Sequence, residues 1–409
     1  MASTLTRVFG IHNLALAEDV VQEALLQALK QWPFSGIPRN PAGWLYQVAK
    51  HKAIDAVRRE QTLARRGPDG SGLPPHGAVE PLISDLFLDE EIKDDTLRMM
   101  FTCCHPALPL ESQIALTLKI LGGFSSAEIA HALLTHEAAI QKRLYRAKQR
   151  IREEQIAFEV PTGPELAPRL RAVLSVLYLM FNEGYSASFT ESPIRRDVCV
   201  EAMRLCKLLT EHPAGNHPGA FALMALMCFH AARFDARLDD SGHLLMLKVQ
   251  DRSKWDRDLI DEGFRYLERS ASGGEIDEIH LEAGIAGLHC VAESYEKTDW
   301  ARIVYLYDLL LQIKPSPVVA LNRAIALAEV QGPRAALAAV EAIQDKDLLD
   351  SYPFLPATLG ELHLRLGEYD EAAQHLERAI ALTSSPAEKH FLRQKRQASQ
   401  ERPAGPLRH

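Results

Sequence analysis

The sequence lacks the short motifs that most often mark a catalytic site. It has no P-loop, no GxGxxG dinucleotide fingerprint, no HExxH zinc motif and no GxSxG nucleophile elbow. No nucleophile is accompanied by a candidate base. We therefore expect neither enzymatic activity nor a cofactor.

Cysteine and long apolar runs are also scarce. The six cysteines contain no Cys-x-x-Cys pair and are too few for a disulfide framework in 409 residues, which fits a reducing cytoplasm. Adjacent Cys103 and Cys104 have no second ligand cluster at zinc-finger spacing, so no metal site is expected. The longest apolar stretches, 173–181 and 220–232, are too short to cross a bilayer, and no secretory signal is apparent. These absences predict a cytoplasmic protein without membrane contact.

Charge is distributed unevenly along a chain whose formal net charge is -8. Residues 50–66 hold six bases against two acids, and residues 80–95 hold seven acids against one base. Residues 141–152 then hold six bases and no acid. Two basic segments separated by an acidic one suggest two surfaces for an anionic partner.

Apolar periodicity predicts an all-α fold. A helix is expected over residues 14–30, and its apolar positions recur at helical spacing: Leu16, Val20, Ala24, Leu25 and Ala28. A second helix follows Pro41, and residues 65–81 are rich in Gly and Pro, as in a linker. From residue 95 to 154, and again after Pro161, the pattern stays helical.

Residues 124–151 carry the pattern of a helix-turn-helix. Ser125 or Ser126 can cap the first helix, with Glu128 placed to return a hydrogen bond. We expect two buried sets, one on each helix: Ile129, Ala130 and Leu133, then Ile140, Leu144, Ala147 and Ile151. The turn has Leu134 where glycine is common, so we expect it to close without a residue of positive φ.

The opposite face of the second helix is polar and basic. Its residues are Gln141, Lys142, Arg143, Arg146, Lys148 and Arg150. Such side chains contact phosphates and base edges, although a merely solvated basic face is an equally open interpretation. Trp44 lies among bases on the predicted helix of residues 41–60, which suits single-stranded nucleic acid, but a packed core tryptophan fits as well.

The last third of the chain repeats itself. Residues 359–382 have glycine, alanine and aromatic residues at the spacing of a tetratricopeptide repeat, and two degenerate copies precede them, which places repeats over about residues 284–390. Two polar clusters, "NEGYSAS" from Asn182 and "QDRSKWD" from Gln250, interrupt apolar helices. They fit either a pocket lining or structural hydrogen bonding.

Together these stretches resemble a known family. "AEDVVQEALLQAL", then "NPAGWLYQVAKHKAIDAVRRE", a Gly/Pro linker and "SSAEIAHALLTHEAAIQKRLYRAKQRI" are similar to the two conserved regions of an extracytoplasmic-function (ECF) RNA polymerase sigma factor. Later stretches, such as "QDRSKWDRDLI" and "PSPVVALNRAIA", resemble the subfamily with a long tetratricopeptide-like C-terminal extension. The resemblance covers nearly the whole chain.

The resemblance implies a domain order. It places sigma region 2, with a shortened first helix, at residues 1–62 and an acidic linker at 63–92. Region 4 with the helix-turn-helix follows at 93–160, and the helical extension at 161–409. The implied partners are core RNA polymerase, promoter DNA, and a protein or peptide at the extension.

The resemblance also assigns roles to positions. The surface that binds polymerase would comprise Glu18, Asp19, Gln22 and Glu23. The element that melts the −10 strand would use Asn40, Trp44, Lys50, Lys52, Arg58 and Arg59. The basic face of residues 141–150 would read the −35 element. A second hypothesis is a tetratricopeptide adaptor whose sigma-like N-terminal region is degenerate.

Overall fold

The computed structural model describes residues 14–36, 41, 44–45, 48–49, 52, 92, 94–154, 156, 161, 165–186, 193–274 and 276–400. These residues form α-helices and short 3-10 turns without a strand, and one isolated β-bridge joins Leu238 to Leu244. The predicted all-α fold is confirmed. The chain divides into two compact units, residues 1–176 with 212–214, and residues 177–211 with 215–409.

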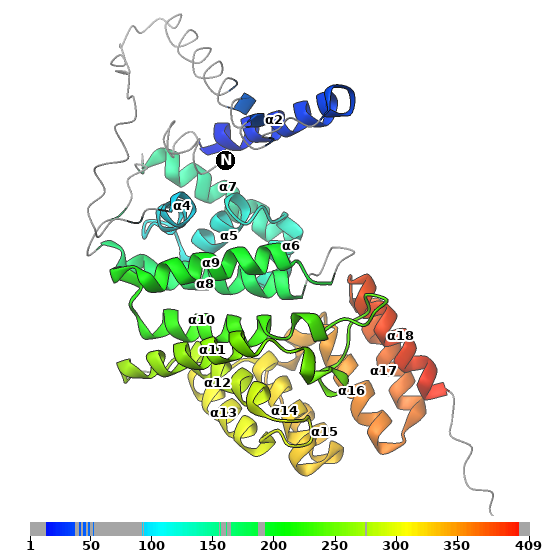
Figure 1. The fold of residues 1–409 in the computed structure, drawn as a ribbon. Coiled ribbons are helices and arrows are strands. Elements are labelled where there is room, and N and C mark those ends of the chain that lie inside the picture. Colours follow the sequence, from blue (N-terminus) through cyan, green and yellow to red (C-terminus); the bar gives the residue numbers. More distant parts are fainter. Residues whose placement is uncertain are drawn as a thin grey trace, which may run out of the picture. The chain divides into compact units, whose positions relative to one another are not determined.

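The first unit contains the N-terminal helices (Figure 1). They are α2 (Leu14–Ser35), α4 (Asp95–Cys103), α5 (Leu110–Ile120), α6 (Ser126–Ala132), α7 (Glu137–Glu153) and the start of α8 (Ala167–Tyr185). Helix α7 packs on both α5 and α6, and α4 packs on α5. Asp94 caps α4 by accepting a hydrogen bond of 2.9 Å from the Leu97 amide.

Helix α2 has a narrower buried face than its sequence predicts. Val20 and Ala24 are buried together with Ala49 in a small core, and Ala28 is also buried. Leu25, predicted to be on this face, is 45% exposed, and the side chain of Leu16 lies outside the described residues. Leu25 follows Ala24 by one residue, about 100° around the helix, so it lies off the face that packs against Leu45, Val48 and Ala49.

A buried arginine secures the end of α4. Arg169, at the start of α8, is only 7% exposed, and its Nη1 donates a hydrogen bond of 3.0 Å to the Phe101 carbonyl. A cation near the last carbonyls of a helix stabilises them, because those carbonyls have no partner within the helix. Burial lowers the pKa of Arg169 from its ordinary value.

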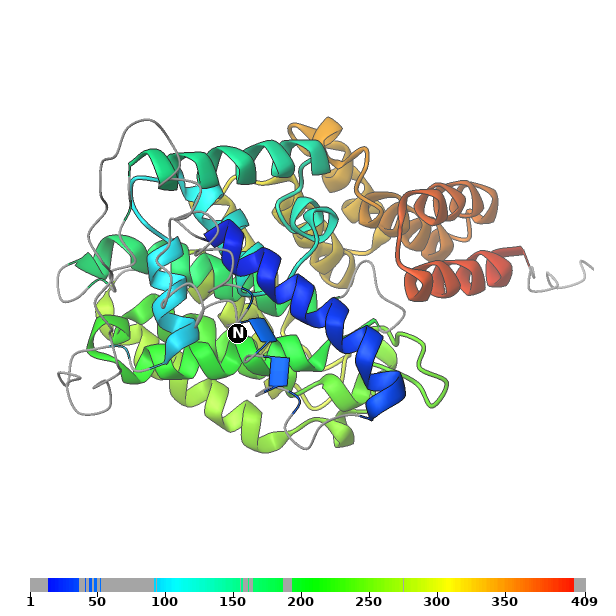
Figure 2. The ribbon, with the colours of Figure 1, turned by 90° about the horizontal axis from the view of Figure 1, so that it is seen from above.

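The second unit is a succession of helices, each packed on the next (Figures 1 and 2). After the end of α8 come α9 (Arg196–Glu211), α10 (Pro218–Ala231), α11 (Arg257–Ser270), α12 (Glu278–Val291), α13 (Trp300–Ile313), α14 (Pro317–Gln331), α15 (Pro333–Glu341), α16 (Phe354–Leu366), α17 (Tyr369–Leu382) and α18 (Pro386–Gln400). Short 3-10 segments join them, among them η4 (Phe234–Ala236) and η6 (Arg252–Lys254). Both views show α17 beside α18.

Two glycines shape the α16–α17 pair. Gly367 ends α16 with φ 76°, a left-handed conformation that glycine adopts without strain. Gly360 allows close contact, because a Cβ there would lie 2.8 Å from Leu376 Cγ. Ala372 and Leu376 are fully buried at this contact.

The cysteines belong to the packed interior. All six are free and buried. Burial raises the pKa of Cys104 to about 12, and burial also raises the pKa of Cys103. Within the described part of the chain, no group of three or more metal-ligating side chains is placed to hold an ion. No described helix is long and apolar enough to span a membrane.

Candidate nucleic-acid interface

Helix α6 begins with a complete capping box. Ser125 Oγ accepts a hydrogen bond of 3.1 Å from the Glu128 amide, and Glu128 Oε2 accepts one of 2.6 Å from the Ser125 amide. Of the two serines predicted as caps, Ser125 is therefore the one used. Ile129 and Ala130 are buried as predicted, and Leu133 is half-buried at the end of the helix.

The turn between α6 and α7 closes through Leu134, which adopts φ 49°. The prediction of a turn without a positive-φ residue was therefore wrong. The Thr135 amide donates to the Ala130 carbonyl at 2.9 Å and the Leu134 amide to the His131 carbonyl at 3.1 Å. These are the two bonds of a Schellman motif, which requires a left-handed residue between them whatever its side chain. Leu134 is 68% exposed, so the left-handed backbone directs its side chain to solvent.

Helix α7 has one buried stripe, and its other faces are exposed or half-exposed. Its buried residues are the four predicted ones: Ile140, Leu144, Ala147 and Ile151, none more than 8% exposed. Since these residues recur every three or four positions, they hold one side of α7 on α5 and α6. The predicted basic residues occupy the remaining faces.

The predicted basic residues differ in their partners. Lys142 and Arg146 are exposed and form no ion pair within the described residues. Two others pair along α7: Gln141 Nε2 donates to Glu137 Oε1 at 3.1 Å, and Arg150 Nε donates to Glu154 Oε1 at 2.7 Å. Arg143 is paired with Glu111 of α5, and Lys148 with Glu18 of α2.

An exposed aromatic residue lies between the two unpaired bases. Tyr145 is 65% exposed and falls three residues after Lys142 and one before Arg146. Sequence reasoning missed it because it concentrated on charge. A tyrosine at a position off the apolar stripe of an amphipathic helix is the signal that could have found it.

The surface predicted to contact the −10 strand also combines aromatic and basic side chains among its described residues. Trp44 is half-buried and packs edge-to-face on Trp32 of α2, with ring centroids 5.6 Å apart. Lys52 Nζ pairs with Glu23 Oε2 of α2 at 2.8 Å. The other residues predicted to contact the −10 strand lie outside the described residues: Asn40, Lys50, Arg58 and Arg59.

Three stretches of the chain match described protein families. Residues 2–62 match sigma-70 region 2, and residues 98–151 match sigma-70 region 4. Residues 169–271 match a family of unknown function, DUF6596. The region 4 match contains α6 and all but the last two residues of α7.

Relatives extend these matches. Over 388 residues the chain is 40% identical to an uncharacterized protein of Rhizobium meliloti, which covers 93% of this chain and 89% of the relative. It is 27% identical to the ECF RNA polymerase sigma factor SigK of Mycobacterium ulcerans, over 36% of this chain and 80% of that protein. It is 29% identical to ECF sigma factor SigL of Mycobacterium tuberculosis, over 34% of this chain and 75% of that protein. No solved structure matches.

Within its first 151 residues the chain therefore matches the two conserved regions of sigma-70 factors, and it is similar to ECF-type sigma factors over about a third of its length. These matches support a role in transcription initiation, for which core RNA polymerase and promoter DNA are the implied partners. Helix α2 lies within the region 2 match, and most of α4 to α7 lies within the region 4 match.

On α2, the residues predicted to bind polymerase differ in exposure. Asp19, Gln22 and Glu23 are exposed, whereas Glu18 is half-buried in its pair with Lys148. Three leucines lie beside them, also exposed, at 45%, 55% and 73%: Leu25, Leu26 and Leu29. An exposed leucine cluster on one helix is a typical docking surface, and sequence reasoning had assigned Leu25 to the core instead.

Proposed function

We propose that the chain acts as an ECF-type sigma factor and uses α7 to read the −35 element of its promoters. One observation carries the proposal: Lys142, Tyr145 and Arg146 form an exposed, cationic surface on the second helix of a capped helix-turn-helix. The second helix of this motif is the one that enters the major groove. Arg143, Lys148, Gln141 and Arg150 would join once their acidic partners on the protein are exchanged for phosphates.

The test is promoter binding and in vitro transcription with core polymerase. The double variant Lys142→Ala/Arg146→Ala should weaken DNA binding about 10- to 100-fold and lower the slope of log K against log salt by about two. The control, Arg334→Ala/Arg393→Ala, removes the same charge from two exposed arginines of α15 and α18. Undiminished transcription by the α7 variant would exclude α7 as the reader.

We further propose that region 2 engages the −10 strand through Trp44 and the basic side chains near it in the sequence. Trp44 is half-buried against Trp32, which leaves part of its ring accessible for stacking on a base. The predicted −10 contacts outside the described residues, Asn40, Lys50, Arg58 and Arg59, remain part of this proposal. Permanganate reactivity of promoter thymines, measured with Trp44→Ala, tests strand opening separately from −35 binding.

The exposed face of α2 is the proposed docking surface for core polymerase. Its leucines would be buried on binding, and Asp19, Gln22 and Glu23 would supply polar contacts at the edge. Leu26→Glu/Leu29→Glu should abolish co-purification with core polymerase, whereas Leu348→Glu, an exposed leucine of the second unit, should not. Retention of core polymerase by the α2 variant would exclude this face as the docking surface, whereas failure of the unmodified chain to co-purify with core polymerase would favour the adaptor hypothesis.

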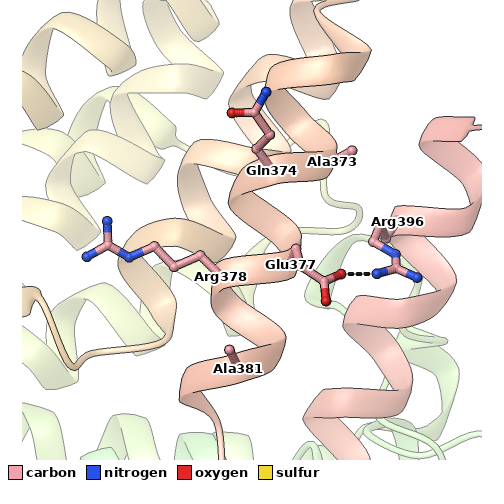
Figure 3. Close-up of a pocket in the computed structure, with 6 residues that line it drawn as sticks. All are labelled: Ala373, Gln374, Glu377, Arg378, Ala381 and Arg396. Atoms are coloured by element: carbon pink, nitrogen blue, oxygen red, sulfur yellow. Dashed lines mark hydrogen bonds and ion pairs between the residues drawn. The ribbon is translucent and has the colours of Figure 1, made fainter.

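For the second unit we propose a tetratricopeptide-like domain that binds a protein or peptide and modulates the sigma regions, without catalysis of its own. The buried Gly360, Ala372 and Leu376 contact between α16 and α17 supports a repeat of this type. A shallow groove of about 510 Å³ runs along α17 and α18, where Figure 3 shows Glu377 paired with Arg396. Promoter activity should be measured after deletion of residues 161–409. Higher activity would mean that the extension inhibits the sigma regions, and lost activity would mean that they require it.

A further inference from the structure

A cluster of cationic and aromatic side chains lies inside the second unit, apart from the groove on α17 and α18. It is built from the end of α10, the loop after it, the "QDRSKWD" segment and the end of α12. We call it the cationic cluster; its members are His230, Arg233, Arg237, Arg252, Trp255 and His289. The sequence left two interpretations open for the polar "QDRSKWD" segment, a pocket lining or structural hydrogen bonding.

Aromatic rings fix the guanidinium groups in place. Arg252 and Arg233 both lie over the indole of Trp255, at 4.5 Å and 5.4 Å from its centroid. Arg237 lies over the ring of Tyr185 at 3.6 Å. Stacking of this kind orients a guanidinium while leaving its N–H edge available. Two arginines on one indole also place like charges within about 10 Å of each other.

No carboxylate among the described residues forms an ion pair with the arginines of the cluster, and Glu296 acts on Arg252 only at longer range. The arginines donate only to neutral acceptors: Arg233 Nε to Gln250 Oε1 at 3.2 Å, and Arg252 Nη1 to the His289 and Ala292 carbonyls at 2.6 Å and 2.7 Å. Arg237 donates to the Tyr185 carbonyl. Elsewhere in this unit, arginines pair with carboxylates, as Arg323 does with Asp308 and Arg365 with Glu329.

The charge also acts on the two histidines. Burial, together with Arg233 and Arg237, lowers the pKa of His230 to about 3. Burial, together with Arg233 and Arg252, lowers the pKa of His289 to about 3. Both imidazoles are therefore neutral at pH 7, and each can donate one N–H to an anion.

Several buried donors of the cluster have no acceptor on the protein. They are Trp255 Nε1, Arg252 Nη2 and the Nδ1 atoms of His230 and His289. Trp255 is only 3% exposed, so its indole N–H is also remote from bulk solvent. A buried hydrogen-bond donor without an acceptor destabilises a fold. Because several such donors lie close to unpaired arginines, we infer that an anion accepts from them.

We propose that the cationic cluster binds the oxyanion group, phosphate or carboxylate, of a small molecule. Guanidinium forks match both groups in geometry and charge, and stacked arginines lose little freedom on binding them. A small ligand is favoured over a macromolecule because the unpaired donor atoms are buried, and a protein or nucleic-acid surface cannot reach them. Gln250 and the carbonyls that now accept from the arginines would keep the forks oriented.

The first experiment titrates the full-length chain with inorganic phosphate and, separately, acetate, at ionic strength held constant with sodium chloride. Saturable binding should raise Tm by about 3–6 °C at ten times Kd. Arg252→Gln and Arg233→Gln should weaken binding at least ten-fold. Arg334→Gln, an exposed arginine of α15 in the same unit, should leave it unchanged.

A second measurement uses no variant, so its result does not depend on whether a variant folds. Oxyanion binding beside His230 and His289 should shift their ring NMR signals in the unmodified chain and raise both pKa values. A response to phosphate alone identifies a phosphate group, and a response to acetate alone identifies a carboxylate. No saturable response to either anion beyond the chloride control, or equal responses of Arg252→Gln and Arg334→Gln, would overturn the proposal.

Discussion

Replacing Leu134 by glycine should stabilise the helix-turn-helix. The residue holds a left-handed conformation, φ 49°, which costs a residue with a Cβ about 1–2 kcal/mol. Because its side chain is 68% exposed, removing it forfeits little buried apolar area. Glycine has greater conformational freedom in the unfolded chain, which offsets about 0.5–1 kcal/mol of this gain in stability. The expected net gain in the free energy of unfolding is about 1 kcal/mol.

Hydrogen exchange in the full-length chain measures this gain locally. Amides of Ile140 and Leu144, buried on α7, should exchange about five-fold more slowly in Leu134→Gly, since they open with the helix-turn-helix. Leu134→Ala is the matched control: it shortens the side chain but keeps the Cβ, so its exchange should stay near that of the unmodified chain. Equal slowing in both variants would refute the argument, because the effect would then come from the exposed side chain and not from the backbone.

Three further predictions concern other parts of the chain. Asp277 accepts a hydrogen bond from His280 and raises the pKa of that imidazole, so the stability this contributes is complete below about pH 6.5 and is lost as pH rises through the raised pKa. Urea unfolding at pH 6 and pH 8.5 should show this loss, and His280→Gln should reduce it. Gly360→Ala places a Cβ 2.8 Å from Leu376 Cγ and should lower the free energy of unfolding of the second unit by about 1–3 kcal/mol in calorimetry. Glu18→Gln frees the α7 lysine with which it pairs and should strengthen DNA binding by the free chain about two- to five-fold in fluorescence anisotropy; unchanged binding would mean that the pair does not compete with DNA.

Local patterns in the sequence predicted the helix-turn-helix well. The buried stripe from Ile140 to Ile151 follows from helical spacing alone, and the capping box from a serine three residues before Glu128. Both depend on interactions within about one or two helical turns, so a single sequence contains the information. The all-α fold follows from the same periodicity.

Features that depend on distant partners were not predictable in this way. The pair of Lys148 with Glu18 joins residues 130 positions apart, and no local pattern indicates it. Leu25 was placed in the core because periodicity gives the face of a helix but not the width of what packs against it. Arg233 and Arg252 meet over Trp255 only because two loops of the second unit come together.

The ion pairs on the proposed contact surfaces change how those surfaces would act. Arg143, Lys148 and Lys52 each pair with an acid of the same chain, so DNA must displace that acid before it gains a contact. Partly exposed pairs of this kind contribute about 0–1 kcal/mol, which is less than a charge-assisted contact to phosphate contributes. Exchange of the acid for a phosphate is therefore favourable, but the lost pair offsets part of the gain. Lys142 and Arg146 carry no such cost. We therefore expect these two residues to set the salt dependence of the first encounter, and the paired residues to contribute only once α7 is seated in the groove.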